Sequence, residues 1–182
     1  AGTDSADFLS RAFVSENLEN TKISTIVKEA AKAAGFELSG IATIRNYAEL
    51  ERFSQWIDQG YSGDMSYLER RNPDGSFRRA SPAFSWARSV VVCAINYNTA
   101  RPYSVQPSEA GQGWISRYAW SREDYHDSVL GRLLQVENYL KQLAGTETIR
   151  TKSYVDTGPI VERVYARYAG IGWLGKTRAS ST

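Results

Sequence analysis

The stretch YVDTGPIVER places one acidic residue where chemistry is often done. Asp156 ends a run that alternates like a strand, and Pro159 suits the first turn of a helix. A carboxylate at this edge can act as a general acid or base, because open sheets tend to collect ligands at the carboxyl ends of their strands. The same position also suits a helix N-terminal cap, and spacing alone favours the cap.

The two interpretations of Asp156 demand opposite pKa values. Helix N–H groups stabilise a carboxylate and lower its pKa, whereas a proton donor near neutral pH needs a pKa raised by burial. Only a large apolar ligand that covers Asp156 would decide for the acid.

The remaining reactive side chains do not predict a metal centre. His126 is the only histidine, and it stands at a predicted helix start with Asp124 and Asp127. Such a histidine is usually solvated or capping, and without a second histidine or a cysteine nearby we expect no metal site. Cys93 is the only cysteine and lies in the apolar run SVVVCAINY, so we expect a core residue. One thiol cannot supply the four ligands that an iron–sulfur cluster normally takes.

Basic residues gather locally although the net charge is only +2. The loop RRNPDGSFRR is most often a solvated face but can meet phosphates; its arginines are Arg70, Arg71, Arg78 and Arg79. Further basic residues that could add to it are Arg117, Arg150, Lys152, Arg163, Arg167, Lys176 and Arg178. Several aromatic residues could stack on bases, although core packing explains most of them: Trp114, Tyr118, Trp120, Tyr154 and Trp173.

The elements that must position these residues are helices and strands in one domain. Periodicity predicts helices over 23–34, from a capping box at Asn46 to Gly60, over 124–143 and over 160–169. Strands are expected over 36–44, 89–97 and 148–156, with one more at WISRYAW, and the strand over 89–97 reads as the sheet's centre, covered on both faces. The predicted order is helix, strand, helix, strand, strand, helix, strand, helix. Residues 61–89 read as a long loop with one short helix near 65–70.

This order predicts an α+β or layered α/β domain with a mixed central sheet flanked by helices. The 182 residues, 42% of them hydrophobic, suffice for one core. We expect residues 1–22 to form an N-terminal extension and residues 23–182 to form the domain. No apolar run approaches the roughly 20 residues of a membrane span, so we expect a soluble, cytoplasmic protein.

Taken together, several motifs resemble one family. The pieces GDMSYLERR, ARSVVVCAINY, SRYAW, DYHDSVL, VDTGPIVER and AGIGWLGK look like the N-terminal, cobalamin-binding domain of epoxyqueuosine reductase, an oxidoreductase of queuosine synthesis in tRNA. The most specific part is VDTGPIVER followed by AGIGWLGK. The resemblance implies a nitroreductase-like corrinoid-binding fold, shared with reductive dehalogenases.

By this resemblance Asp156 is the proton donor to the epoxide oxygen and lies at a bound corrin. The residues that match cofactor-contacting positions of the family are Arg79, Ser116, Asp156 and Thr177. Those that match motif positions at the substrate or behind the site are Tyr125, His126, Arg163 and Lys176. The implied cofactor is cobalamin and the implied partner is tRNA.

The family's ferredoxin-like domain, with two cysteine clusters for [4Fe–4S] centres, is expected beyond GWLGK, whereas this sequence has Cys93 alone. We therefore expect that the chain needs an electron-donor domain or protein and does not turn over by itself. Two alternatives stay open: a stand-alone corrinoid-binding or interaction module, and a nitroreductase-like flavin domain. The sequence leaves the oligomeric state open.

Overall fold

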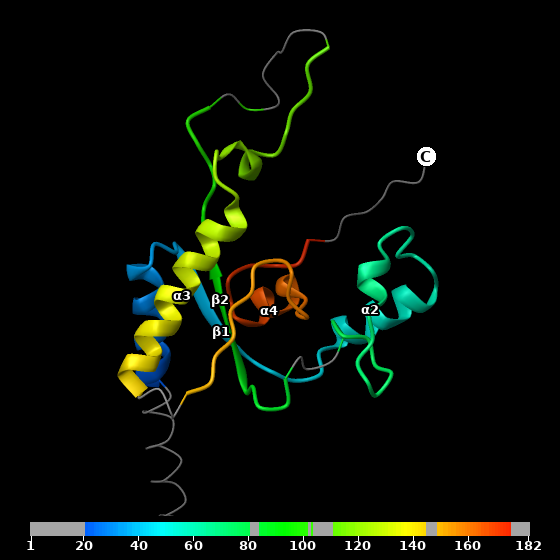
Figure 1. Ribbon diagram of the computed structural model, residues 1–182, viewed down its shortest axis with the longest axis horizontal. Coiled ribbons are helices and arrows are strands. Elements are labelled where there is room, and N and C mark those ends of the chain that lie inside the picture. Colours follow the sequence, from blue (N-terminus) through cyan, green and yellow to red (C-terminus); the bar gives the residue numbers. More distant parts are fainter. Residues whose placement is uncertain (1–20, 81–83, 102, 104–110, 145–148, 176–182) are drawn as a thin grey trace, which may run out of the picture.

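The structure is a computed structural model that describes residues 21–80, 84–101, 103, 111–144 and 149–175 (Figure 1). A first helix is described over residues 21–33. It is followed by β1 (Leu38–Thr43), α2 (Ala48–Asp58), the 3-10 helix η1 (Ser66–Glu69), β2 (Ser89–Ala94), the 3-10 helix η2 (Arg117–Trp120), α3 (Tyr125–Ala144) and α4 (Glu162–Tyr168). This confirms the α+β class and the four predicted helices.

The centre of the fold is an antiparallel pair of strands. β1 and β2 pair from Leu38 opposite Ala94 to Thr43 opposite Ser89. The first helix and α3 lie on one side of this pair, and α4 lies on the other (Figure 1). Side chains of β2 alternate between these layers, because Val92 packs towards α4 while Cys93 packs towards α3. The prediction that this strand is covered on both faces is therefore confirmed.

A glycine in β1 lets the sheet and α4 approach closely. A Cβ atom on Gly40 would lie 2.1 Å from the backbone oxygen of Ala169, at the end of α4. No side chain fits in that space, which explains a glycine inside a strand. The contact fixes where α4, and hence the segment before it, meets the sheet.

Aromatic packing also fixes the position of α4. The Tyr47 ring meets the Tyr165 ring edge-on, with centroids 5.6 Å apart, and stacks on the Tyr168 ring at 3.8 Å. Tyr47, Tyr165 and the neighbouring Leu50 are all buried. The start of α4 is thus anchored in the core, while the turn before it carries polar residues.

Three local predictions are wrong. Residues 149–156 form no strand, and Ser153 of this segment donates a hydrogen bond to Glu137 at 2.9 Å instead. The segment before α3 forms η2 where another strand was expected, so the described sheet is an antiparallel pair and smaller than the predicted mixed sheet. Asn46 does not cap α2. Tyr47 occupies the N-cap position, and no side chain caps it, because core packing fixes this helix start.

Other details were predicted correctly. Gly35 adopts a positive φ of 87° after the first helix, as expected of a left-handed cap. The long loop contains a short helix over Ser66–Glu69. None of the helices in the described ranges has the length and apolar character needed to cross a membrane.

Candidate functional site

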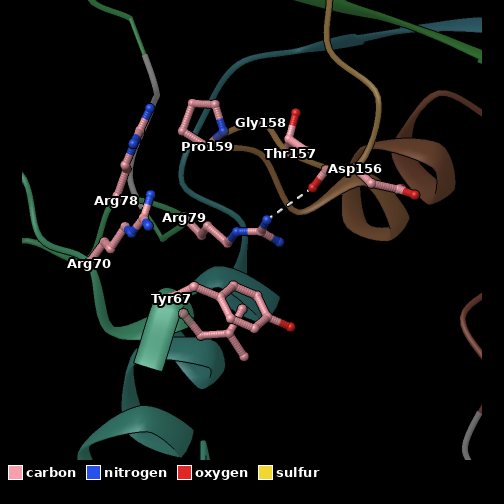
Figure 2. A pocket seen from close by; sticks show the side chains of 9 residues that line it. Tyr67, Arg70, Arg78, Arg79, Asp156, Thr157, Gly158 and Pro159 are labelled. Carbon is pink, nitrogen blue, oxygen red and sulfur yellow. Dashed lines mark hydrogen bonds between the residues drawn. The ribbon is translucent and has the colours of Figure 1, made fainter. Parts of the chain in front are cut away.

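A pocket of about 250 Å³ opens between the arginine-rich loop and the turn before α4 (Figure 2). Its lining residues are Tyr67, Leu68, Arg70, Arg78, Arg79, Asp156, Thr157, Gly158 and Pro159. Three guanidinium groups and one carboxylate give the lining a net positive charge. Such a lining favours an anionic or strongly polar part of a ligand.

The backbone at Asp156 is strained. Its φ is 55°, and among the described residues no other non-glycine residue has a positive φ. The N–H of Thr157 donates to the oxygen of Val155 at 2.5 Å, which closes a three-residue turn around Asp156. A left-handed conformation costs a residue with a side chain about 1–2 kcal/mol. Such strain often occurs at functional sites, where the surrounding structure holds it in place.

Contacts from two other segments hold this turn. Nη2 of Arg79 donates to the backbone oxygen of Asp156 at 3.1 Å (Figure 2). On the other side, the hydroxyl of Tyr125 donates to Oδ2 of Asp156. This hydrogen bond is the largest of the influences that raise the pKa of Tyr125 to about 12. Tyr125 therefore keeps its proton at neutral pH and serves as a hydrogen-bond donor.

The helix-capping interpretation of Asp156 is wrong. Helix α4 begins at Glu162, its N-cap residue is Val161, and no side chain caps it. The carboxylate of Asp156 bonds to Tyr125 at the start of α3 instead. It also follows a strand that does not form, so it lies in a turn rather than at a sheet edge.

A second carboxylate and the histidine lie behind Asp156. Nε2 of His126 is 3.8 Å from Oδ2 of Asp156, and its Nδ1 is 2.8 Å from Oδ1 of Asp124. The backbone N–H of His126 also donates to this Oδ1 at 2.8 Å. This backbone hydrogen bond is the largest of the influences that lower the pKa of Asp124. His126 thus lies between two carboxylates.

Glu162 is a site residue that the sequence analysis did not single out. Its Oε1 is buried and has no hydrogen-bond partner among the residues described. Burial is the largest cause that raises the pKa of Glu162; a backbone hydrogen bond and Arg79 lower it, and Asp156 raises it. The carboxyl group of Glu162 therefore interacts with the charges of both Arg79 and Asp156. Nothing in the sequence signals its burial, because glutamate is common in the first turn of a helix.

The arginines of the loop divide into two groups. Arg70, Arg78 and Arg79 line the pocket, and Arg70 and Arg78 form no ion pair within the described part of the chain. Arg71 turns away, lies 3.5 Å from a carboxylate oxygen of Asp58 and covers the ring of Phe77. The sequence predicted the cluster but could not tell which of its members face one site.

The structure brings four of the predicted site residues together: Asp156, Arg79, Tyr125 and His126. Ser116 precedes η2 and Arg163 lies exposed on α4, and neither lines the pocket. Lys176 and Thr177 lie outside the described residues. Sequence reasoning missed Tyr67 and Thr157, for which the sequence carries no signal.

Core packing does not account for most of the predicted aromatic residues. Trp114, Tyr118 and Trp120 are exposed, and Trp173 is 98% exposed. Cys93 packs beside a core cluster as expected, and burial raises its pKa to about 11. No group of three or more metal-ligating side chains occurs in the part of the chain that the structure describes.

Comparison with known proteins gives one consistent result. The family model described as "Epoxyqueuosine reductase QueG, DUF1730" matches residues 78–157. The epoxyqueuosine reductase of Gloeobacter violaceus is 37% identical over 153 residues, which are 82% of this chain and 44% of the relative. This chain therefore spans less than half the length of that curated relative.

Solved structures agree with the sequence match. An epoxyqueuosine reductase bound to an epoxyqueuosine-modified tRNA stem loop has a TM-score of 0.64 and 30% identity, covering 84% of this chain and 39% of that one. The Bacillus subtilis epoxyqueuosine reductase, described with an aspartate-bearing catalytic loop swung out of the active site, has a TM-score of 0.62 and 29% identity, with the same coverage. The chain is therefore related, over most of its own length, to a portion of the epoxyqueuosine reductases.

Proposed function

We propose that this chain is the cobalamin-binding portion of an epoxyqueuosine reductase-type enzyme, with Asp156 as the proton donor. The substrate would be the epoxide of epoxyqueuosine in tRNA, and the product queuosine. The observation that carries this proposal is the strained turn of Asp156, which borders an arginine-lined pocket with its backbone oxygen towards Arg79 and its carboxylate towards Tyr125. The Bacillus subtilis neighbour is described with an aspartate-bearing catalytic loop, which supports an aspartate in a loop as the acid.

The reaction defines what the site must supply. Reducing the epoxide to an alkene breaks two C–O bonds and releases the oxygen as water, which consumes two electrons and two protons. Asp156 can deliver a proton to the departing oxygen as a general acid. A bound ligand that covers Asp156 would exclude bulk water from this transfer.

The residues present suit cobalamin as one face of its site. The pocket volume of about 250 Å³ is smaller than the roughly 300–1,000 Å³ of a site that encloses a drug-sized ligand, so it can take only the edge of a corrin. The guanidinium of Arg79 can donate to the amides that fringe such a ring, and Ser116 and Thr177 are further contacts by resemblance. Cobalamin, when bound, would supply a cobalt centre that passes electrons to the substrate.

The chain's own residues position the proton donor. Tyr125 fixes Oδ2 of Asp156 through its hydroxyl, and Arg79 fixes the backbone of the same residue. Oδ1 has no hydrogen-bond partner among the described residues, so it is the oxygen free to face a bound ligand. Electrons would come from a separate donor domain or protein, which the resemblance gives as iron–sulfur centres, and we place the reaction in the cytoplasm.

Binding of tRNA is part of the same proposal. Arg70 and Arg78 line the pocket beside Arg79, and neither is neutralised by a carboxylate within the described residues. Guanidinium groups bind phosphate well because their donors match its geometry. In Figure 2 these two side chains lie on the side of Arg79 away from Asp156, so a nucleic-acid backbone there would leave Asp156 free for the base.

The test uses the complete enzyme with an electron donor. We expect the visible spectrum of added cobalamin to change on binding, and mass spectrometry to detect queuosine in tRNA that carried epoxyqueuosine. Flavin mononucleotide is the control ligand. Binding of flavin instead of cobalamin would support the nitroreductase-like alternative, and cobalamin binding without queuosine would support a corrinoid-binding module.

A further inference from the structure

The proposed reaction leaves one need unmet at Asp156. Each turnover consumes two protons, whereas the carboxyl group of Asp156 carries one. If the proposed function holds, Asp156 must regain a proton while ligand occupies the pocket. Asp156 lines that pocket and its side chain is 60% exposed, so water reaches the carboxylate until a ligand covers it.

The geometry provides a second approach to Asp156, from α3. His126 does not line the pocket, yet its Nε2 lies 3.8 Å from Oδ2 of Asp156. The His126 side chain is 38% exposed, so it also meets water. A hydrogen bond needs about 2.7–3.2 Å, so a shift of roughly 1 Å would bring the two groups into contact.

Asp124 orients the imidazole ring for this contact. Oδ1 of Asp124 lies 2.8 Å from Nδ1 of His126 and accepts the backbone N–H of the same residue. A carboxylate at Nδ1 favours a proton on that nitrogen and leaves Nε2 to face Asp156. The same division of roles occurs in a hydrolase triad, where an aspartate fixes the tautomer of a catalytic histidine.

We propose that His126, oriented by Asp124, returns a proton from water to Asp156. The Nε2 proton of the imidazolium ion passes to the carboxylate of Asp156 and leaves a neutral ring with its proton on Nδ1. A hydronium ion from solvent then protonates Nε2 and leaves water, so one proton is taken from solvent for each proton delivered and charge balances over the cycle. Tyr125, whose ring lies 4.1 Å from that of His126, keeps its own proton and only orients Asp156.

The first test needs neither cofactor nor turnover. His126 is the only histidine, so the ¹⁵N resonances of labelled histidine require no assignment. We expect neutral His126 to carry its proton mainly on Nδ1. In Asp124→Ser the population should move towards the Nε2–H form, because serine keeps a good helix cap but cannot reach the ring.

The matched control is Asp127→Asn, which removes a neighbouring carboxylate in the same helical turn and should leave the tautomer unchanged. A dominant Nε2–H form in the wild-type chain would overturn the proposal. So would a tautomer that is the same in Asp124→Ser. If Asp124→Ser does not fold, the wild-type tautomer alone decides.

The second test asks whether His126 moves protons. In the complete enzyme, His126→Ala should lower kcat by about 10²-fold, a typical loss for a proton-transfer group, with little change in KM. Added imidazole should restore much of this loss in His126→Ala and none of it in Asp156→Asn. Unchanged turnover, or a loss that imidazole does not restore, would overturn the relay. Failure of the proposed function would differ, because the wild-type enzyme would then form no queuosine.

Discussion

The core around α4 and the turn before it are neighbours in sequence, but different forces hold them. The core relies on apolar burial, with Leu50 2% exposed and Tyr165 4% exposed. The Asp156 turn has a positive φ and relies on polar contacts with Arg79 and Tyr125, from two distant segments. The core can therefore hold the start of α4 while the strained turn presents a carboxylate. Stability and activity should respond to different substitutions.

The largest effect on stability is expected in the core. Gly40→Ala would place a Cβ atom 2.1 Å from the backbone oxygen of Ala169, so β1 and α4 must separate. We expect a loss of about 3 kcal/mol or more in the free energy of unfolding, since rigid backbone cannot yield as a side chain can. Denaturant unfolding measures it. Gly131→Ala, in α3, is the control, because a Cβ atom there would meet nothing within 4 Å. Alanine should stabilise this helix slightly. Equal stability of both variants would contradict the packing account.

The arginines of the pocket should affect binding and leave the core intact. In Arg70→Gln with Arg78→Gln, affinity for tRNA should fall, and the slope of log affinity against log salt should decrease by about 2, one for each lost phosphate contact. Arg71→Gln is the control, because this residue is engaged near Asp58. A slope equal to that of wild type would mean that the two pocket arginines do not contact phosphate.

A smaller effect on stability is expected at Gly158, which packs against the side chain of Tyr154 within the same segment. In Gly158→Ala the new Cβ would lie 2.7 Å from Cγ and 2.9 Å from Cβ of Tyr154, so the root of that side chain and the turn must shift. We expect a loss of about 1–3 kcal/mol in the free energy of unfolding, the range typical of overpacking, together with reduced turnover because the turn shifts. Gly172→Ala, with nothing within 4 Å, should change neither quantity. Full activity in Gly158→Ala would show that the turn tolerates displacement.

The smallest effect concerns the buried carboxyl of Glu162, and it depends on pH. The folded-state pKa is raised by burial, so this group's stabilising contribution is present below the unfolded pKa of about 4.3 and is lost as pH rises through the folded pKa. Because glutamine does not ionise, Glu162→Gln does not lose this stability and should melt at a higher temperature than wild type at pH 7. The difference should narrow below about pH 4.3. A wild-type advantage at pH 7 would contradict the burial argument.

The same contrast explains what the sequence could predict. The helices and β2 follow from regular spacing of apolar residues, which packing satisfies. The site depends on long-range contacts: Tyr125 bonds to Asp156 across 31 positions of sequence, and Arg79 across 77. No local pattern encodes such pairs. The alternation over 148–156 predicted a strand that never forms, because alternation does not reveal whether a partner strand exists.

The central claim is that Asp156 donates a proton, and replacing it by asparagine tests this most directly. Asparagine keeps the shape and tolerates a positive φ, but it cannot transfer the proton. In the complete enzyme, Asp156→Asn should still bind cobalamin. Its free energy of unfolding should differ from that of the wild type by no more than about 1 kcal/mol, as expected for one altered hydrogen bond. Queuosine formation should fall by roughly 10²–10⁴-fold. Turnover and melting are measured on the same preparation. Unchanged turnover per folded molecule would remove Asp156 from the mechanism.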